Sequence, residues 1–174
     1  MVPFFPLGLP GGYLTIAYLA AHHLHRNGRR GGPEIVTSAW CGWLAQRGVK
    51  LFYRRERPVA RGKRYRTDSF PSGHTTGLTS LAVASALALS RQRLVSPVAA
   101  AAIAVGASTL MGAYRVLADD HWTTDVVGGW MVGGAVALAC DALLAGATGG
   151  AAHGAARAVT ARGRKRRLLR RPGR

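Results

Sequence analysis

Long stretches of this chain carry no charged residue, and that segregation limits most strongly what it can fold into. Five apolar segments cover residues 13–24, 35–45, 75–90, 96–113 and 126–144. The longer ones approach the ~20 residues that an α-helix needs to cross a bilayer. The connections between them are basic, and the 174-residue chain has a formal net charge of +17. The pattern predicts an all-α polytopic membrane bundle of about five to six helices.

Five spans would place alternate connections on opposite sides of a membrane. Residues 26–34, residues 91–93 and the C-terminal tail would then share one side, and all three are basic. Lys and Arg are enriched in cytoplasmic loops, so we expect a multi-pass protein of the cytoplasmic membrane. Residues 1–150 would form the integral-membrane domain, and residues 151–174 a basic cytoplasmic tail.

So basic a chain can also indicate nucleic-acid binding. Here the charge lies between and after apolar segments, which fits a membrane protein better. Anionic lipid headgroups are therefore the expected partners of the basic loops and the tail, and we expect no nucleic-acid partner. The sequence leaves the oligomeric state open.

Two cysteines, Cys41 and Cys140, lie within apolar segments. We interpret them as small core residues rather than as a disulfide. No spacing of Cys and His suggests a zinc site, and we expect neither a metal nor another cofactor. The last apolar segment contains Gly128, Gly129, Gly133 and Gly134, and these glycines predict close helix packing.

A candidate reactive group lies between the last two apolar segments. Arg115, His121 and Asp125 occur there in order. If this junction is helical, His121 and Asp125 share one face, because they are four residues apart. The Asp125 carboxylate can then accept a proton from one ring nitrogen of His121 and leave the other unprotonated and nucleophilic. Arg115 is a fixed cation suited to phosphate.

Further cations follow the second apolar segment. Lys50, Arg54 and Arg57 would form one stripe on a helix that ends at Pro58. Residues 59–70, a loop, add Arg61, Lys63, Arg64 and Arg66. A solvated basic loop and an anion site both remain open on this evidence.

The third apolar segment is preceded by Pro71, Ser72, Gly73 and His74. A Pro-Ser-Gly turn that opens a helix exposes backbone N–H groups, which suit an anion. Ser72 can also cap this helix. His74 would stand at the helix mouth, beside any bound anion.

Five spans would bring these three segments together on the extracytoplasmic face. Cations there can offset the charge of a transferring phosphoryl group. One imidazole can attack phosphorus while the other protonates the leaving oxygen. The combination predicts phosphoryl transfer through a phosphohistidine.

The same three segments resemble the signature of the type 2 phosphatidic acid phosphatase superfamily, which also includes vanadium haloperoxidases and some bacterial acid phosphatases. Its Lys-x6-Arg-Pro part is matched from Lys50 to Pro58, and its Pro-Ser-Gly-His part from Pro71 to His74. Its Ser-Arg-x5-His-x3-Asp part is matched at Arg115, His121 and Asp125, although Tyr114 stands where the pattern has Ser. Membrane members of the family typically have six spans, whereas we count about five.

The resemblance implies a role for each matched residue. His121 would be the phosphorylated nucleophile, Asp125 would orient it, and His74 would be the general acid and later help to activate water. The expected phosphate-binding residues are Lys50, Arg57, Ser72, Gly73 and Arg115. Hydrolysis in this family needs no metal ion.

We therefore expect a membrane lipid phosphate phosphatase acting on a phosphomonoester or diphosphate. Phosphatidate, phosphatidylglycerophosphate and polyprenyl phosphates or diphosphates are candidate substrates. The preference for Arg over Lys suggests a GC-rich bacterial genome and makes a polyprenyl-linked sugar phosphate one candidate. The alternatives are a vanadate-dependent haloperoxidase and a non-catalytic basic membrane protein that binds anionic lipid.

Overall fold

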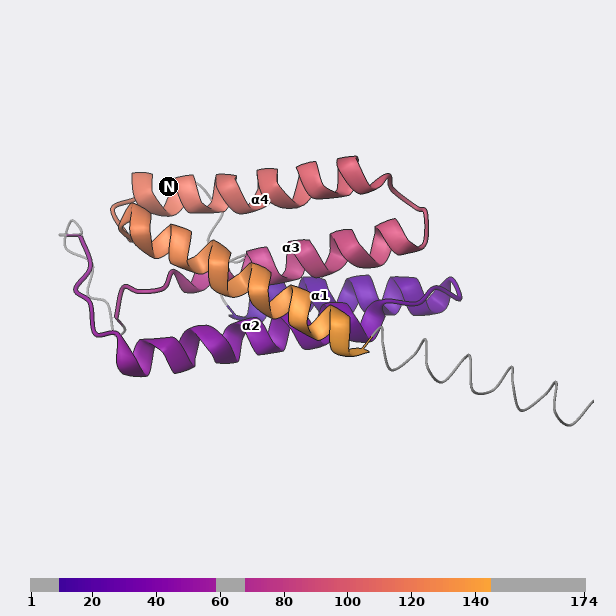
Figure 1. Cartoon of the computed structure of the whole chain (residues 1–174), viewed down its shortest axis with the longest axis horizontal. Helices are drawn as coiled ribbons and strands as arrows, with labels where there is room; N and C mark the ends of the chain where they lie inside the picture. The colour runs from indigo at the N-terminus through magenta and orange to yellow at the C-terminus, as the bar shows by residue number, and fades with distance from the viewer. Residues whose placement is uncertain (1–9, 59–67, 145–174) are drawn as a thin grey trace, which may run out of the picture.

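The structure is a computed structural model that describes residues 10–58 and 68–144, and all regular elements within these ranges are α-helices (Figure 1). They are α1 (Pro10–Arg26), α2 (Gly32–Phe52), α3 (Gly73–Arg91), α4 (Pro97–Leu117) and a last helix, Thr123–Leu144. The predicted all-α bundle is confirmed, with one helix for each apolar segment. The basic residues expected at 61–66 and the tail at 151–174 lie outside the described residues.

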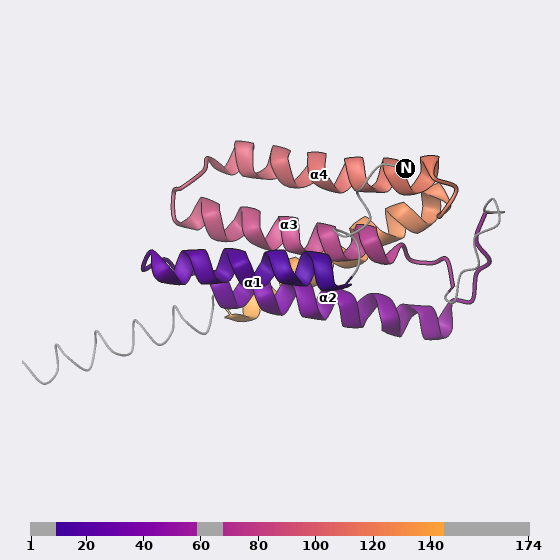
Figure 2. The ribbon, with the colours of Figure 1, turned by 180° about the vertical axis from the view of Figure 1, so that it is seen from behind.

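The helices run back and forth, so their connections fall at two opposite ends of the bundle (Figures 1 and 2). One end holds the α1–α2 and α3–α4 connections. The other holds the α2–α3 connection and the turn between α4 and the last helix. α3 contacts α1, α2 and α4, while the last helix crosses the others obliquely (Figure 1). Segments distant in sequence therefore meet at the second end.

Local sequence explains where α3 and α4 begin. The Ser72 side chain accepts from the Thr75 N–H and caps α3, and Ser96 caps α4 in the same way through Ala99. Serine is favoured at this position because its oxygen satisfies a backbone donor that has no partner within the helix. The predicted capping role of Ser72 is thus confirmed.

The predicted end of α2 is wrong. The helix stops at Phe52, and Tyr53 is extended (φ −110°, ψ 90°). Lys50 lies in the last helical turn, whereas Arg54 and Arg57 lie beyond it, in a stretch without regular secondary structure. The single helical stripe of these three cations does not form.

Glycines let the last helix approach α3 closely. A Cβ added at Gly133 would lie 2.6 Å from the Thr76 carbonyl oxygen, and one at Gly129 would lie 3.1 Å from the Ser72 carbonyl oxygen. A Cβ at Gly128 would lie 2.4 Å from the Phe70 ring. The predicted close packing is confirmed at these three positions, whereas Gly134 has nothing within 4 Å among the described residues.

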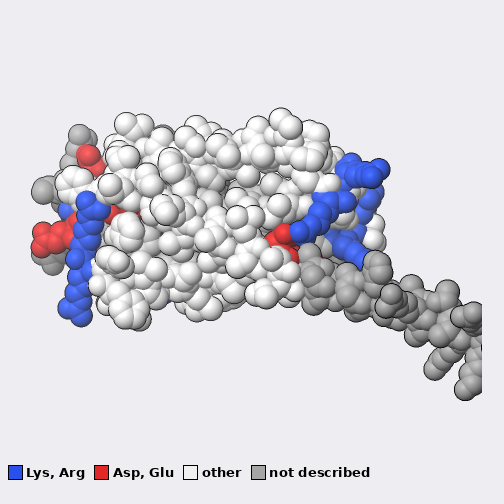
Figure 3. Space-filling model, in the orientation of Figure 1, with Lys and Arg blue, Asp and Glu red and all other residues white. Residues whose placement is uncertain are grey.

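Charged side chains gather at the two ends of the bundle and leave a broad uncharged band between them (Figure 3). α4 and the last helix are the two described helices that are long and apolar enough to cross a membrane. α4 also turns large apolar side chains outward: Val98 is 81% exposed and Leu110 is 74% exposed. Such outward faces fit a hydrocarbon environment better than water.

Polar contacts close the end of the bundle opposite the α2–α3 connection. Both terminal nitrogens of Arg91 donate to the Asp141 carboxylate and so join α3 to the last helix. The Gln92 side chain donates to the Arg30 carbonyl and accepts from the Arg30 N–H. Elsewhere, Cys41 and Cys140 are free thiols, as expected; Cys140 is buried, whereas Cys41 is only partly buried.

Candidate active site

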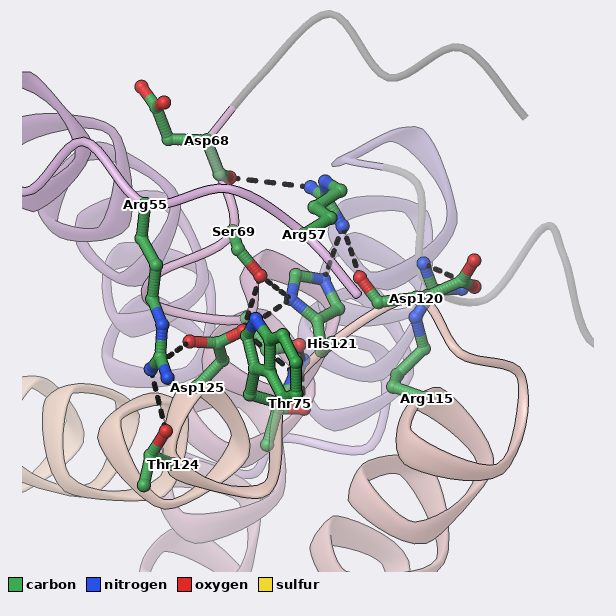
Figure 4. A network of polar contacts seen from close by, with 12 residues as sticks. Arg55, Arg57, Asp68, Ser69, Thr75, Arg115, Asp120, His121, Thr124 and Asp125 are labelled. Carbon is green, nitrogen blue, oxygen red and sulfur yellow. Dashed lines mark hydrogen bonds and ion pairs between the residues drawn. The ribbon is translucent and has the colours of Figure 1, made fainter. Parts of the chain in front are cut away.

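A tight turn after α4 brings His121 back over the end of that helix. Asp119 adopts the left-handed conformation (φ 55°), which Asp tolerates better than most residues. The N–H groups of Asp120 and His121 then both donate to the Arg115 carbonyl, at 3.1 and 3.2 Å. Arg115 and His121 are thereby fixed side by side, as Figure 4 shows.

His121 and Asp125 do not share a helical face, because the last helix begins only at Thr123. The turn nevertheless brings the His121 ring to the Asp125 carboxylate, with 3.5 Å between Nδ1 and Oδ2. The Ser69 hydroxyl also lies 3.5 Å from Nδ1 and hydrogen-bonds to Asp125 Oδ2. The predicted pairing therefore forms by a different route, with Ser69 beside it.

The Asp125 carboxylate is completely buried and is bound on both oxygens. Oδ1 accepts from Arg55 Nη1 at 3.0 Å. Oδ2 accepts from the Trp122 N–H at 2.9 Å and from the Ser69 hydroxyl. Because a buried carboxylate is stable only when paired and hydrogen-bonded, these contacts fix the orientation of the Asp125 side chain.

Arg57 contacts the second ring nitrogen of His121, with 3.0 Å between Nη1 and Nε2. A guanidinium can only donate, so Nε2 must accept through its lone pair. The proton of a neutral His121 ring then sits on Nδ1, the nitrogen facing Asp125. This tautomer leaves Nε2 unprotonated, as the sequence predicted.

Burial and nearby positive charge lower the pKa of His121 to about 2. Burial is the largest cause, followed by the charges of Arg57, Arg115, Lys50 and His74. The ring is therefore neutral at physiological pH. Lys50, Arg57, Arg115 and His74 therefore all lie close enough to His121 to act on its pKa.

Hydrogen bonds hold each of the three cations in place. Lys50 Nζ donates to the Asp68 carbonyl and, at 3.4 Å, to the Ser69 carbonyl. Arg57 Nη1 donates to the Asp120 carbonyl at 2.8 Å, and Arg115 Nη2 pairs with the Asp120 carboxylate at 2.9 Å. The three cations are thus held in place by backbone carbonyl groups and by the Asp120 carboxylate.

The start of α3 forms the floor of this cluster. The Ser72 N–H donates to the Asp125 carbonyl at 2.9 Å, so the Ser72 hydroxyl, rather than its backbone, remains able to donate to a ligand. Gly73 lies against Gln46, whose Oε1 would be 3.1 Å from an added Cβ. His74 Nε2 is buried and has no hydrogen-bond partner among the described residues.

Four residues of this network were not singled out in the sequence: Arg55, Ser69, Asp120 and Trp122. The Trp122 indole donates to the Glu56 carbonyl at 3.0 Å, and Arg55 lies over its ring at 5.6 Å. Nothing in the spacing of the basic residues in this part of the sequence distinguishes Arg55 from its basic neighbours. Asp120 directly precedes His121, and Ser69 lies two residues before Pro71. This closeness to recognised motif residues is the signal that could have found them.

The arrangement can hold an oxyanion beside an unprotonated imidazole. The oxyanion would be surrounded by three cations, the N-terminus of α3 and His121 Nε2. No group of three or more His, Cys, Asp or Glu side chains within residues 10–58 and 68–144 is placed to hold a metal ion.

The chain belongs to the PAP2 superfamily, whose sequence model matches residues 34–147. This confirms the resemblance read from the three motifs. No curated protein sequence matches the chain.

The fold is similar to a crystal structure of a transmembrane PAP2-type phosphatidylglycerolphosphate phosphatase from Bacillus subtilis, with a TM-score of 0.63. The two sequences are 23% identical, and the match covers 79% of this chain and 71% of that protein. At this identity the likeness establishes a shared fold, a helical bundle also found in a membrane protein.

Proposed function

We propose that this protein is a membrane lipid phosphate phosphatase that hydrolyses a lipid phosphomonoester or diphosphate through a phosphohistidine at His121. One observation carries the proposal: a buried, neutral His121 turns its Nε2 lone pair toward a guanidinium, while Asp125 supports the opposite side of the ring. A nucleophilic imidazole requires this protonation state.

In the first step, phosphate oxygens take over the hydrogen bonds of Arg57 and release His121 Nε2. This nitrogen attacks phosphorus, and the bond from phosphorus to the lipid oxygen breaks. Lys50, Arg57 and Arg115 bind the phosphoryl oxygens, with Ser72 and Gly73 at the start of α3 adding hydrogen bonds. Asp125 accepts a hydrogen bond from the Nδ1–H group of His121 and stabilises the His121 ring as it becomes positive.

His74 supplies the proton for the departing lipid oxygen. The negative charge of a bound phosphate favours the protonated form of a neighbouring imidazole. Its unpartnered Nε2 is available for this transfer. In the second step, neutral His74 accepts a proton from water, the resulting oxygen attacks phosphorus, the P–N bond breaks and phosphate leaves. No step requires a metal ion.

The proposed setting is the cytoplasmic membrane, with residues 1–150 as the membrane domain. The uncharged band between the charged ends (Figure 3) supports a bundle that spans the bilayer. The end away from the site carries Arg26, Arg29, Arg30 and Arg93, which favours placing that end of the bundle on the cytoplasmic side of the membrane. The site would then face the extracytoplasmic side, and residues 151–174 would contact anionic lipid from the cytoplasm.

A site at the membrane edge suits a substrate whose tail stays in lipid. Phosphatidate, phosphatidylglycerophosphate and polyprenyl phosphates all meet this condition. The fold shared with a phosphatidylglycerolphosphate phosphatase supports including glycerolipid phosphates among the candidates.

The test is phosphate release from these lipids by purified protein in detergent, with EDTA present. His121→Ala and His74→Ala should each lower kcat by at least about 10³-fold. His25→Ala is the matched control, since His25 is exposed at the other end of the bundle, and it should retain full activity. Labelled substrate should leave acid-labile phosphate on the protein, and His121→Ala should abolish it. Activity that survives both site mutations would refute the proposal.

A further inference from the structure

Asp120 brings a negative charge into the group of cations that are expected to bind phosphate. Its Oδ2 lies 2.9 Å from Arg115 Nη2, and each of the two side chains is only 6% exposed. The Asp120 N–H also donates to the Arg115 carbonyl at 3.1 Å. Because solvent and salt screen a buried pair only weakly, the Asp120 charge acts on Arg115 at nearly full strength.

Asp120 also engages Arg57. The Asp120 carbonyl accepts a hydrogen bond from Arg57 Nη1 at 2.8 Å (Figure 4). Burial lowers the pKa of the Arg57 guanidinium, and the Asp120 charge is the strongest of the nearby charges that oppose this effect. One residue therefore contacts two of the three cations assigned to phosphate.

The family signature does not specify residue 120. Between Arg115 and His121 the signature leaves five positions open, and Asp120 occupies the last of them. The matched residues supply the cations and the nucleophile, whereas the acid that faces those cations is not part of the signature. Its presence in the pocket therefore needs an explanation of its own.

An acid at this place weakens the binding of phosphate. A phosphate that approaches Arg115 must either displace the Asp120 carboxylate or lie beside it, and like charges at short range repel strongly where solvent is excluded. A lipid phosphate is also held by its tail in the membrane, whereas inorganic phosphate is held only by its contacts in the site. The acid therefore favours departure of the product without releasing the substrate from the membrane.

We propose that Asp120 competes with phosphate for Arg115 and thereby promotes release of the inorganic phosphate formed in the second step. The inference rests on the proposed phosphatase activity and adds a residue that acts through Arg115 and Arg57. The rival role for Asp120 is to hold Arg115 in the orientation that binds phosphate. The two roles predict opposite results, because loss of a competitor strengthens phosphate binding and loss of a positioning residue weakens it.

The test is calorimetric titration of inorganic phosphate into the full-length protein in detergent micelles. Asp120→Asn removes the charge at nearly constant shape and keeps an acceptor for Arg115. It should bind phosphate about 10- to 100-fold more tightly than the wild type does. Asp120→Ser, a smaller neutral replacement, should change the affinity in the same direction, so the result does not depend on the folding of one variant. Asp120→Glu keeps the charge and should keep the weaker binding of the wild type.

Glu56→Gln is the matched control. It removes a negative charge from the same end of the bundle, but Glu56 is exposed, and solvent screens its charge. The affinity for phosphate should therefore stay within about twofold of the wild-type value. Phosphate release from phosphatidate gives a second measurement, in which added inorganic phosphate should inhibit Asp120→Asn at a correspondingly lower concentration than the wild type.

Unchanged or weaker phosphate binding in Asp120→Asn and Asp120→Ser would overturn the inference and indicate that the acid only supports Arg115. Tighter binding in Glu56→Gln as well would also overturn it, because any lost negative charge would then have the same effect. A wild-type protein that neither binds phosphate nor hydrolyses any candidate lipid would refute the proposed function itself.

Discussion

Arg55 holds the Asp125 carboxylate in place, although it occupies an unspecified position of the Lys-x6-Arg-Pro motif. Its Nη1 donates to Asp125 Oδ1 at 3.0 Å and to the Thr124 hydroxyl at 2.6 Å. The Asp125 carboxylate can therefore rotate neither toward solvent nor away from His121. We interpret Arg55 as a positioning residue that acts on His121 through Asp125.

Replacing Arg55 should impair turnover more than substrate binding. Arg55→Gln should lower kcat by about 10- to 100-fold with little change in KM, because substrate contacts stay intact while the His121 ring loses its fixed orientation. Steady-state kinetics of phosphate release measure both constants. Arg54→Gln, an exposed neighbouring arginine, removes the same charge and should have little effect on either. A rise in KM alone would instead indicate that Arg55 contacts the substrate.

At this scale the sequence predicted which residues meet but not how they are held. The motif residues converge as expected, since their spacing had already restricted their chemistry. The Ser69 contact between His121 and Asp125 was not predictable, because it depends on the path of the α2–α3 connection. That path is set by long-range contacts such as the bond from the Ser69 N–H to the Arg55 carbonyl.

Close packing of the last helix against α3 is the element-level feature that holds the site together. Gly133→Ala would drive a methyl group against the Thr76 carbonyl, 2.6 Å away. We expect a loss of about 1–3 kcal/mol in the free energy of unfolding, measured as a lower Tm in detergent.

Gly134→Ala is the matched control, since an added Cβ there meets nothing within 4 Å among the described residues. It should raise stability by up to about 1 kcal/mol, because alanine favours helix more than glycine does. Equal destabilisation by both substitutions would show that helix contact at Gly133 is not the cause.

Helix positions followed from the apolar segments, but the end of α2 did not. In a helix, residues two apart point to nearly opposite faces. Arg55 and Arg57 reach Asp125 and His121, which contact each other, and the non-helical chain after Phe52 permits this. Tertiary contacts therefore outweighed the local helical preference between Tyr53 and Pro58.

The whole molecule separates its charges into two ends, and this predicts how it lies in a membrane. In a protein without native cysteines, Glu56→Cys lies near the site and Leu94→Cys lies between α3 and α4. A membrane-impermeant thiol reagent added to intact cells should label the first and not the second. Labelling of Leu94→Cys alone would reverse the proposed orientation, and labelling of both would contradict a spanning bundle.

The contact between Arg57 and His121 has one further consequence for reactivity. In the resting protein the guanidinium covers the attacking nitrogen at 3.0 Å. Only a ligand that offers Arg57 a better acceptor can uncover it. Neutral electrophiles should therefore leave this imidazole unmodified, and covalent inhibitors will need an anionic head to gain entry.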